Sequence, residues 1–148
     1  MGTVEAIFLR PGARVPVRPV STARAVRDQG LEGDHAVGGR RQVTILSREA
    51  WEAACRDFGQ QVDPSVRRAN LLVSGLDLAG TIGATLQIGG AQIDVTMETR
   101  PCELMDDGGR IGLCAALSPA RRGGVLGVVR EGGAISVGDP VEVAPTRA

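Results

Sequence analysis

Hydrophobic and polar residues alternate over many short stretches of this chain, and glycine or proline separates most of them. Alternation with a period of two is typical of strands that bury one face, and Gly- and Pro-rich punctuation is typical of turns. Two Gly-Gly pairs, at 89–90 and 132–133, each lie between two such stretches and predict two β-hairpins. The stretches that we interpret as strands are 3–9, 20–27, 42–46, 71–73, 85–88, 91–96, 125–129, 134–137 and 141–143.

One stretch instead has the periodicity of an α-helix. Apolar residues recur at helical spacing up to residue 58, so one face is expected to be buried, and Cys55 lies on that face. Ser47 has the side chain of an N-cap, and Gly59 is suited to the left-handed position that ends a helix. We therefore predict one clear α-helix over residues 47–58, with only short helical turns elsewhere.

Many short strands and a single clear helix predict a mainly β protein, built as a barrel or a sandwich. The 148 residues are enough for one domain with a sizeable core, and no internal repeat divides them. We expect residues 1–148 to form a single domain.

Composition narrows the function classes. Hydrophobic residues make up 43% of the chain and the formal net charge is 17 − 17 = 0, which argues against disorder and against generic binding of polyanions. Aromatic residues are 2% of the chain, so stacking platforms for single-stranded nucleic acid are essentially missing. No signal peptide or apolar run of transmembrane length is present, and we expect a cytoplasmic protein with no nucleic-acid or membrane partner.

The segment around Cys102 is the first candidate for chemistry. Pro101 lacks the backbone donor that a central strand needs, so the strand before it is expected to end near Thr99. Cys102 then lies at a strand-to-loop junction, where proline suits the start of a short helical turn. Arg100 and nearby N–H groups favour the thiolate, the form that attacks electrophiles and binds metals. The alternative is that Cys102 is a small buried hydrophobic residue.

Residues 29–41 are rich in glycine and charge, and we predict a long loop, a kind of segment that is often functional. This loop contains His35, the only histidine of the chain, directly after Asp34. The carboxylate could orient or charge the imidazole, which makes the pair a candidate for proton transfer. The alternative is a histidine that has no chemical role.

Arginine pairs and the helix start are candidate anion sites. All 17 basic residues are arginines, whose planar forks suit phosphate and carboxylate. The N–H groups at the start of a helix capped by Ser47 also favour an anion. The alternative is that the pairs are solvated edges. The pairs at predicted strand ends are Arg40–Arg41, Arg67–Arg68 with Asn70 two residues later, and Arg121–Arg122 with Gly123 next.

Several common sites are excluded by their missing signatures. There is no lysine for a Walker A motif, no G-x-G-x-x-G opening a helix, and one histidine cannot form a multi-histidine metal site. The three cysteines are too widely spaced for a zinc site or a disulfide framework. A metal held by one thiolate needs further ligands, which an organic cofactor could bring, and the anion sites would hold the phosphate of that cofactor.

Taken together, the motifs resemble the MOSC family, the domain found at the C-terminus of molybdenum-cofactor sulfurases and as free-standing bacterial proteins. Any one fragment is short and weak as a signal. Together the fragments extend over nearly the whole chain, and their order and spacing make the resemblance fairly specific. The fragments are Gly30-Leu31-Glu32-Gly33-Asp34-His35, Arg41-Gln42-Val43-Thr44-Ile45, Ser47-Arg48-Glu49, Arg68-Ala69-Asn70-Leu71-Leu72-Val73, Pro101-Cys102, Arg122-Gly123-Gly124-Val125 and the closing stretch 131–139.

The resemblance implies a mainly β, closed barrel and a molybdenum cofactor (molybdopterin) or a role in sulfur transfer. The family cysteine corresponds to Cys102, which would ligate molybdenum or carry a persulfide. Arg68 and Asn70 match the family's Arg-x-Asn signature and would hold the pterin and its phosphate. Ser47 matches the helix start that contacts the phosphate. Arg41, Arg122 and Gly123 lie in the other matching fragments and are expected to bind the cofactor.

The chain departs from the family pattern at Thr99, where many relatives have a second cysteine, so a two-cysteine relay is not expected. Three functions stay open at this point. The first is a molybdenum-dependent reductase of N-oxygenated or N-hydroxylated small molecules, which receives electrons from a separate donor protein. The second is a carrier of sulfur on Cys102, supplied by a sulfur-donor protein, and the third is a non-catalytic cofactor-binding module.

Overall fold

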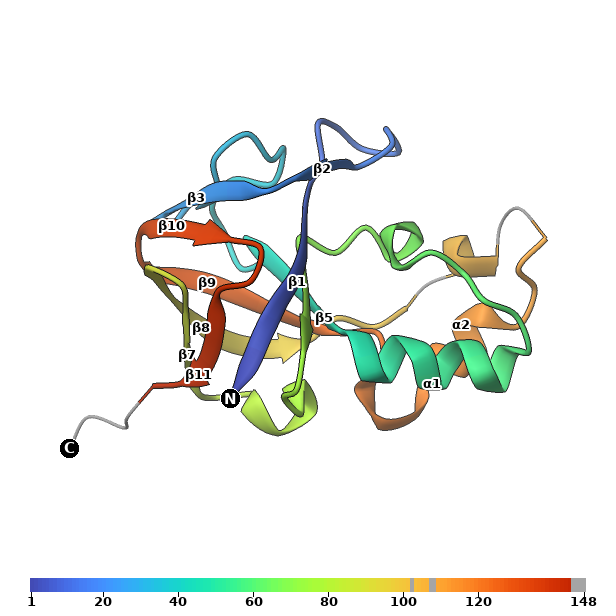
Figure 1. Cartoon of the computed structure of the whole chain (residues 1–148). Helices are drawn as coiled ribbons and strands as arrows, with labels where there is room; N and C mark the ends of the chain where they lie inside the picture. Colours follow the sequence, from blue (N-terminus) through green and yellow to red (C-terminus); the bar gives the residue numbers. More distant parts are fainter. Residues whose placement is uncertain (102, 107–108, 145–148) are drawn as a thin grey trace.

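The computed structural model describes residues 1–101, 103–106 and 109–144 (Figure 1). Its strands are β1 (Gly2–Leu9), β2 (Arg18–Val20), β3 (Thr22–Val26), β4 (Gly30–Leu31), β5 (Val43–Ser47), β6 (Leu71–Ser74), β7 (Thr85–Ile88), β8 (Ala91–Glu98), β9 (Val125–Glu131), β10 (Gly133–Ser136) and β11 (Pro140–Val143). Its helices are α1 (Arg48–Phe58) and α2 (Leu113–Leu117), with 3-10 helices η1 (Pro64–Arg67), η2 (Leu78–Thr81), η3 (Glu103–Asp106) and η4 (Pro119–Arg121).

Seven strands close into a barrel. Their order is β11-β7-β8-β9-β5-β6-β1, and pairing of β1 with β11 closes the ring, with Gly2 opposite Val141. The short strand β2 pairs with the C-terminal end of β1, at Ile7 to Leu9. A separate sheet has the order β10-β3-β4. Because the ring is closed, each of the seven strands has a neighbour on both sides, which confirms the mainly β, closed-barrel fold expected from the sequence.

Strands β5 and β6 are parallel neighbours, and α1 forms the crossover that this arrangement requires. The helix begins as predicted, because the Ser47 Oγ accepts a hydrogen bond from the N–H of Ala50 at 3.1 Å. It ends at Gly59, which has the left-handed φ of 89°. Figure 1 shows α1 and α2 side by side next to the barrel, so the helices cover one side of it.

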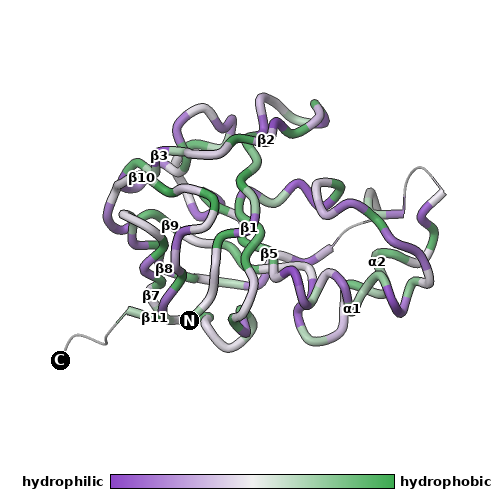
Figure 2. The backbone as a smooth tube through the Cα atoms, viewed as in Figure 1, coloured by the Kyte–Doolittle hydropathy of each residue, from purple (hydrophilic) through white to green (hydrophobic). Residues whose placement is uncertain are grey.

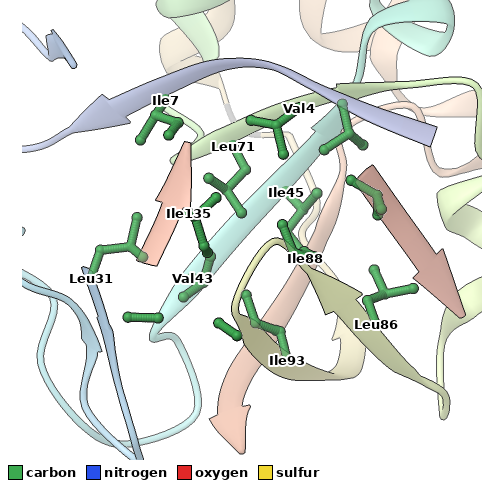
Figure 3. Packing of buried hydrophobic residues seen from close by; sticks show 14 of the residues in the cluster. Val4, Ile7, Leu31, Val43, Ile45, Leu71, Leu86, Ile88, Ile93 and Ile135 are labelled. Carbon is green, nitrogen blue, oxygen red and sulfur yellow. The ribbon is translucent and has the colours of Figure 1, made fainter. Parts of the chain in front are cut away.

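Two hydrophobic clusters hold the fold together. The larger one fills the barrel with branched aliphatic side chains, such as Ile45, Leu71 and Ile93, each fully buried (Figure 3). The smaller one lies between the barrel and the helices and contains Trp51 and Cys55, so Cys55 is a core residue as its helical spacing predicts. Along the chain, the hydrophobic stretches lie mainly on strands and helices, while connecting loops carry many of the hydrophilic ones (Figure 2).

The first predicted hairpin is confirmed and the second is wrong. Strands β7 and β8 pair across Gly89-Gly90, as expected. Strand β9, in contrast, continues to Glu131, and Gly132 alone separates it from β10, which is too little for a two-residue turn. Strand β10 leaves the barrel and pairs with β3, where Ile135 lies opposite Ala23.

Two further strand predictions need correction. The single strand expected over 20–27 is divided at Ser21 into β2 and β3, which belong to different sheets. The predicted loop at 29–41 begins with the two-residue strand β4, which pairs with β3. Of the helices in the described parts of the chain, none is long and apolar enough to cross a membrane.

Candidate functional site

A cavity of about 480 Å³ lies where segments from distant parts of the chain meet. Six of its lining residues are arginines, and none of the described lining residues is acidic. Such a wall is suited to anions, because guanidinium groups are cationic donors whose planar forks match phosphate and carboxylate. The lining residues are Arg10, Arg14, Arg41, Thr44, Val66, Arg67, Arg68, Thr99, Met105 and Arg110.

The topology of the barrel brings these residues together. Arg10 follows the end of β1, and Arg67 and Arg68 precede the start of β6, which runs antiparallel to β1. Arg41 precedes the start of β5, which is parallel to β6, and Thr99 follows the end of β8. All of these positions therefore lie at the same end of the barrel.

Arg10 is held by the carboxylate of Asp34. Its Nε and Nη2 donate to Oδ1 and Oδ2 of Asp34 at 3.2 and 2.9 Å, and its backbone N–H donates to Oδ1 at 2.7 Å. The side chains are 14% and 0% exposed, so water screens this pair little. The bidentate geometry both orients the guanidinium and neutralises its charge.

Burial by itself would raise the pKa of Asp34, but its hydrogen bonds outweigh this effect. The Arg10 side chain, the Arg10 backbone N–H, the Arg10 charge and the N–H of Ala36 together lower the pKa below its ordinary value of 3.8. Asp34 is therefore ionised at neutral pH. Its partner in the structure is Arg10, and His35 next to it is exposed, with its backbone N–H donating to the Arg10 carbonyl at 2.8 Å.

Asn70 completes this buried network. Its Oδ1 accepts from the Arg10 Nη2 and from the N–H of Thr44, both at 3.0 Å. Its Nδ2 donates to Oδ1 of Asp34 and to the Phe8 carbonyl, both at 3.1 Å. Asn70 is 0% exposed and does not line the cavity, so in the described structure it holds Arg10 from behind the wall.

Arg67 connects three segments at the cavity. Its Nε donates to the Gly123 carbonyl at 2.9 Å, and its Nη2 donates to the backbone carbonyl and to Oγ1 of Thr99, both at 3.2 Å. Gly123 packs against the same segment, because a Cβ at this position would lie 2.7 Å from the Thr99 carbonyl oxygen. Both contacts hold the chain that leads to position 102.

Arg68 holds the loop between β1 and β2. Its guanidinium donates to the carbonyls of Gly12, at 2.9 Å, and Val15. Arg68 itself has a left-handed φ of 62°, a conformation that disfavours most side chains. This loop carries Arg14, which also lines the cavity.

The other residues predicted from the sequence divide between two places. Arg41 lines the arginine cavity and is exposed. Ser47 and Arg122 line a separate pocket of about 40 Å³. Arg122 forms an ion pair of 2.5 Å with Asp57 and donates to the Ala116 carbonyl at 3.0 Å.

The predicted anion site at the start of α1 already contains protein groups. Besides its capping bond, Ser47 donates to Oε2 of Glu49 at 3.3 Å, and Oε1 of Glu49 accepts from the N–H of Gly75 at 2.7 Å. Burial alone would raise the pKa of Glu49, but the Gly75 N–H and the other bonds of its carboxylate lower it. A carboxylate therefore lies at this helix start.

Cys102 is outside the described residues. Its neighbours in the sequence are informative, because Thr99 on one side and Met105 on the other both line the arginine cavity. Strand β8 ends at Glu98 and η3 follows Pro101, which matches the predicted strand end and helical turn. In the described parts of the chain, no group of three or more His, Cys, Asp or Glu side chains could hold a metal ion.

Sequence reasoning missed three of the six arginines of the cavity wall, Arg10, Arg14 and Arg110. It named a fourth, Arg67, as one member of a candidate anion-binding pair. Arg10 stands in an Arg-Pro-Gly turn signal and gives no local hint of a site. The one signal available in the sequence was the residue type that these positions share. This signal is not specific, because an arginine in a turn can belong to an anion site or to none.

Comparison with known proteins places this fold and site in a family. The profile of the MOSC domain matches residues 32–142, which is three quarters of the chain. The chain belongs to the MOSC family. MOSC domains are commonly associated with the molybdenum cofactor. A search among curated proteins gives no match.

Solved structures show the same fold. The YuaD protein from Bacillus subtilis is 22% identical with a TM-score of 0.80, over 95% of this chain and 94% of that chain. YiiM from Geobacillus stearothermophilus is 17% identical with a TM-score of 0.79, over 98% and 76% of the two chains. YiiM from Escherichia coli is 22% identical with a TM-score of 0.72, over 99% and 71%. At these identities the likeness concerns the fold.

Proposed function

We propose that this MOSC protein binds a molybdenum cofactor in the arginine cavity and reduces N-oxygenated small molecules there. The observation that carries the proposal is the composition of the cavity wall, with six arginines and no acidic lining residue among those described. Molybdopterin carries a terminal phosphate, and arginine forks are the groups that bind phosphate with two parallel hydrogen bonds.

The residues present fit this cofactor. Arg41 and Arg68 line the cavity, and Asn70 with Asp34 orients the Arg10 guanidinium before any ligand binds, which would lower the entropic cost of binding. The volume of about 480 Å³ lies within the ordinary range for a cofactor-sized ligand. Cys102 would ligate the metal, a role that rests on the family resemblance.

Ser47, Arg122 and Gly123 have a different place in the proposal. Gly123 would act through the close packing that fixes residues 99–101, since a side chain there would displace them. Ser47 and Arg122 border the smaller pocket and would contact the cofactor only through an extension beyond the arginine cavity.

The reaction converts R–NH–OH, two electrons and two protons into R–NH2 and H2O. When bound, the cofactor supplies a two-electron redox centre, and the electrons come from a separate donor protein. Asp34 is ionised and bound to Arg10, so it is suited to position Arg10. His35 is the exposed neighbour that we propose as proton donor, because histidine transfers protons near neutral pH.

Metal analysis and intact mass of the full chain test this proposal. The chain should be purified anaerobically from a molybdate-fed host that makes the cofactor. We expect close to one molybdenum per chain, lost in Cys102→Ala and retained in Cys114→Ala, a matched control at a half-buried cysteine outside the cavity lining. Donor electrons should then reduce an N-hydroxylated amidine.

Two results on metal content and mass, and one on activity, would overturn the reductase proposal. One is wild-type protein that contains no molybdenum under these conditions. The other is a mass increase of one sulfur on Cys102, removable by reductant, with no molybdenum, which would instead indicate a sulfur carrier. A cofactor that binds without any reduction of N-oxygenated compounds would indicate a binding module.

A further inference from the structure

Two loops meet on one side of the barrel, next to the arginine cavity. The first, residues 10–17, joins β1 to β2, and the second, residues 32–42, joins β4 to β5. The backbone N–H of His35 donates to the Arg10 carbonyl at 2.8 Å, which connects the two loops. Figure 1 shows both loops on the side of the barrel where β2 lies. Arg10 of the first loop and Arg41 of the second line the cavity, so both loops border it.

Exposed side chains of these loops form a basic surface beside the cavity. Each loop exposes one valine, since Val15 is 44% exposed and Val37 is 67% exposed. Arg18 begins β2 and lies opposite Leu9, the residue before Arg10. We call this surface the basic rim, and its residues, all exposed, are Arg14, Val15, Arg18, Val37 and Arg40.

The arginines of the basic rim have no partner in the part of the chain that the structure describes. The side chains of Arg14, Arg18 and Arg40 form no ion pair or hydrogen bond with a described residue. Residues 10–18 contain no acidic residue, and in the second loop the carboxylate of Asp34 is bound to Arg10. The basic rim therefore has an excess of positive charge, although the chain as a whole has a formal net charge of zero.

Hydrogen bonds hold the basic rim in place before any partner binds. The Arg68 guanidinium donates to the carbonyls of Gly12 and Val15 in the first loop. In the second loop, the N–H of Gly38 donates to the Gln29 carbonyl at 2.8 Å. A surface that is already ordered loses little conformational entropy on binding. Because arginine is enriched at the interfaces between proteins, the basic rim is suited to a protein partner.

We propose that the basic rim is the docking surface for an acidic redox protein that delivers electrons to the arginine cavity. The need for this donor rests on the function proposed above, whereas the place and charge of the rim rest on the structure. Two electrons for each substrate pass from the donor, which is oxidised, to the bound cofactor. Opposite charges on two protein surfaces speed and orient their encounter, and electron-transfer complexes bury small interfaces. A donor on the rim lies next to the cavity, where the electrons are used.

A nucleic acid is the other class of negatively charged partner, and the basic rim suits it less well. The rim contains no aromatic side chain on which a base could stack. It offers three arginines, whereas proteins that bind duplex DNA strongly contact about six to ten phosphates. Duplex DNA is therefore the comparison probe in the experiment.

An NMR titration of the isotope-labelled, cofactor-free full chain tests the docking surface, with an acidic plant-type ferredoxin as the probe at low salt. We expect the amide signals of both loops and β2 to shift or broaden, and those of α1 to stay unchanged. Arg18→Gln and Arg40→Gln, neither of which alters the cavity lining, should each weaken binding about twofold to fivefold. Arg56→Gln is the matched control, because it removes an exposed arginine of α1 that has no described partner, and it should leave the affinity unchanged.

Electron transfer to the cofactor-loaded protein is the second measurement. Reduced ferredoxin should react more slowly with Arg18→Gln and Arg40→Gln than with the wild type, by the same factors. This loss should diminish at high salt, because salt screens charges on exposed surfaces. Reduced methyl viologen is a small cationic donor that needs no docking surface, so it should reduce the wild type and both variants at equal rates.

Three results would overturn this inference. The first is a ferredoxin titration that leaves the signals of the basic rim unchanged. The second is that Arg18→Gln and Arg40→Gln bind and react with ferredoxin as Arg56→Gln does. The third is duplex DNA that binds the rim more tightly than ferredoxin at the same salt concentration, which would indicate a nucleic-acid site instead.

The proposed function and the docking surface fail in different measurements. A chain that acquires no molybdenum refutes the reductase, while the titration of the cofactor-free chain still tests the basic rim. Loaded protein that methyl viologen reduces, with equal ferredoxin rates in the rim variants and in Arg56→Gln, refutes the docking surface and leaves the reductase in place.

Discussion

Replacing Asp34 by Asn should destabilise the fold far more than the removal of one exposed charged side chain does. Oδ1 of Asp34 accepts from the Arg10 N–H, the Arg10 Nε and the Asn70 Nδ2, and Oδ2 accepts from the Arg10 Nη2 and the Ala36 N–H. In either orientation, an asparagine amide nitrogen replaces one of these acceptors and faces at least two donors.

The magnitude follows from burial. Two buried donors without an acceptor cost about 1–3 kcal/mol each, and breaking a buried ion pair costs about 3–5 kcal/mol in total. Because the Arg10 side chain is 14% exposed, water offsets part of this cost. We expect Asp34→Asn to lower the free energy of unfolding by about 3 kcal/mol at pH 7, toward the lower end of that range.

The same residue predicts a pH dependence. The pKa of Asp34 is lower in the folded chain than its ordinary value of 3.8. In the pH window between these two pKa values the unfolded chain binds more protons than the folded chain, so the free energy of unfolding rises with pH there. The contribution of Asp34 is complete above the ordinary value and is lost as the pH falls through the folded value. Asp34→Asn lacks this group, so its unfolding free energy should depend less on pH in that window.

Urea unfolding measures both effects, with fluorescence of the single tryptophan, Trp51, which is 3% exposed. The matched control is Glu52→Gln, which removes an exposed partner of Arg48 at 3.7 Å and should cost less than about 0.5 kcal/mol. If Asp34→Asn costs no more than this control, or keeps the wild-type slope below pH 4, the argument for a buried, ionised Asp34 is refuted.

Three further substitutions test the structure around the site by the same unfolding assay. Arg67→Gln should cost about 2 kcal/mol, because a charged donor that joins Gly123 to Thr99 is lost; no loss of stability would contradict that connection. Gly123→Ala should cost about 1–3 kcal/mol from overpacking against the Thr99 carbonyl, whereas Gly80→Ala, with its nearest contact at 3.4 Å, should cost less. Equal costs would refute the close approach. Ser47→Ala should cost about 1 kcal/mol through loss of the N-cap bond, and an unchanged stability would show that the cap is dispensable.

Local patterns were sufficient for most elements of the fold. The cap at Ser47, the left-handed Gly59 and the helical spacing between them define α1, because all three act within a few residues of one another. The hairpin of β7 and β8 follows from alternation around Gly89-Gly90 for the same reason. The second hairpin failed, since pairing of β10 with β3 joins residues more than a hundred positions apart.

The candidate site divides in the same way. The residue types, the Arg68-x-Asn70 signature and the position of Pro101 are properties of the sequence alone, and they indicated anion binding and the MOSC family, to which the chain belongs. These properties did not show that Arg68 lines the cavity whereas Asn70 lies behind its wall, because both residues stand just before the start of β6.

What the sequence determined by itself is therefore most of the local elements and the family, because these depend on neighbouring residues or on residue type. It also predicted an anionic ligand, from the residue type alone. Only the tertiary structure decided which arginines share one cavity and which are neutralised. Closure of the barrel places the end of β1 beside the starts of β5 and β6, so Arg10 meets Asp34 and Asn70 across gaps of 24 and 60 residues. Proximity over such distances arises from the path of the whole chain, which no local pattern encodes.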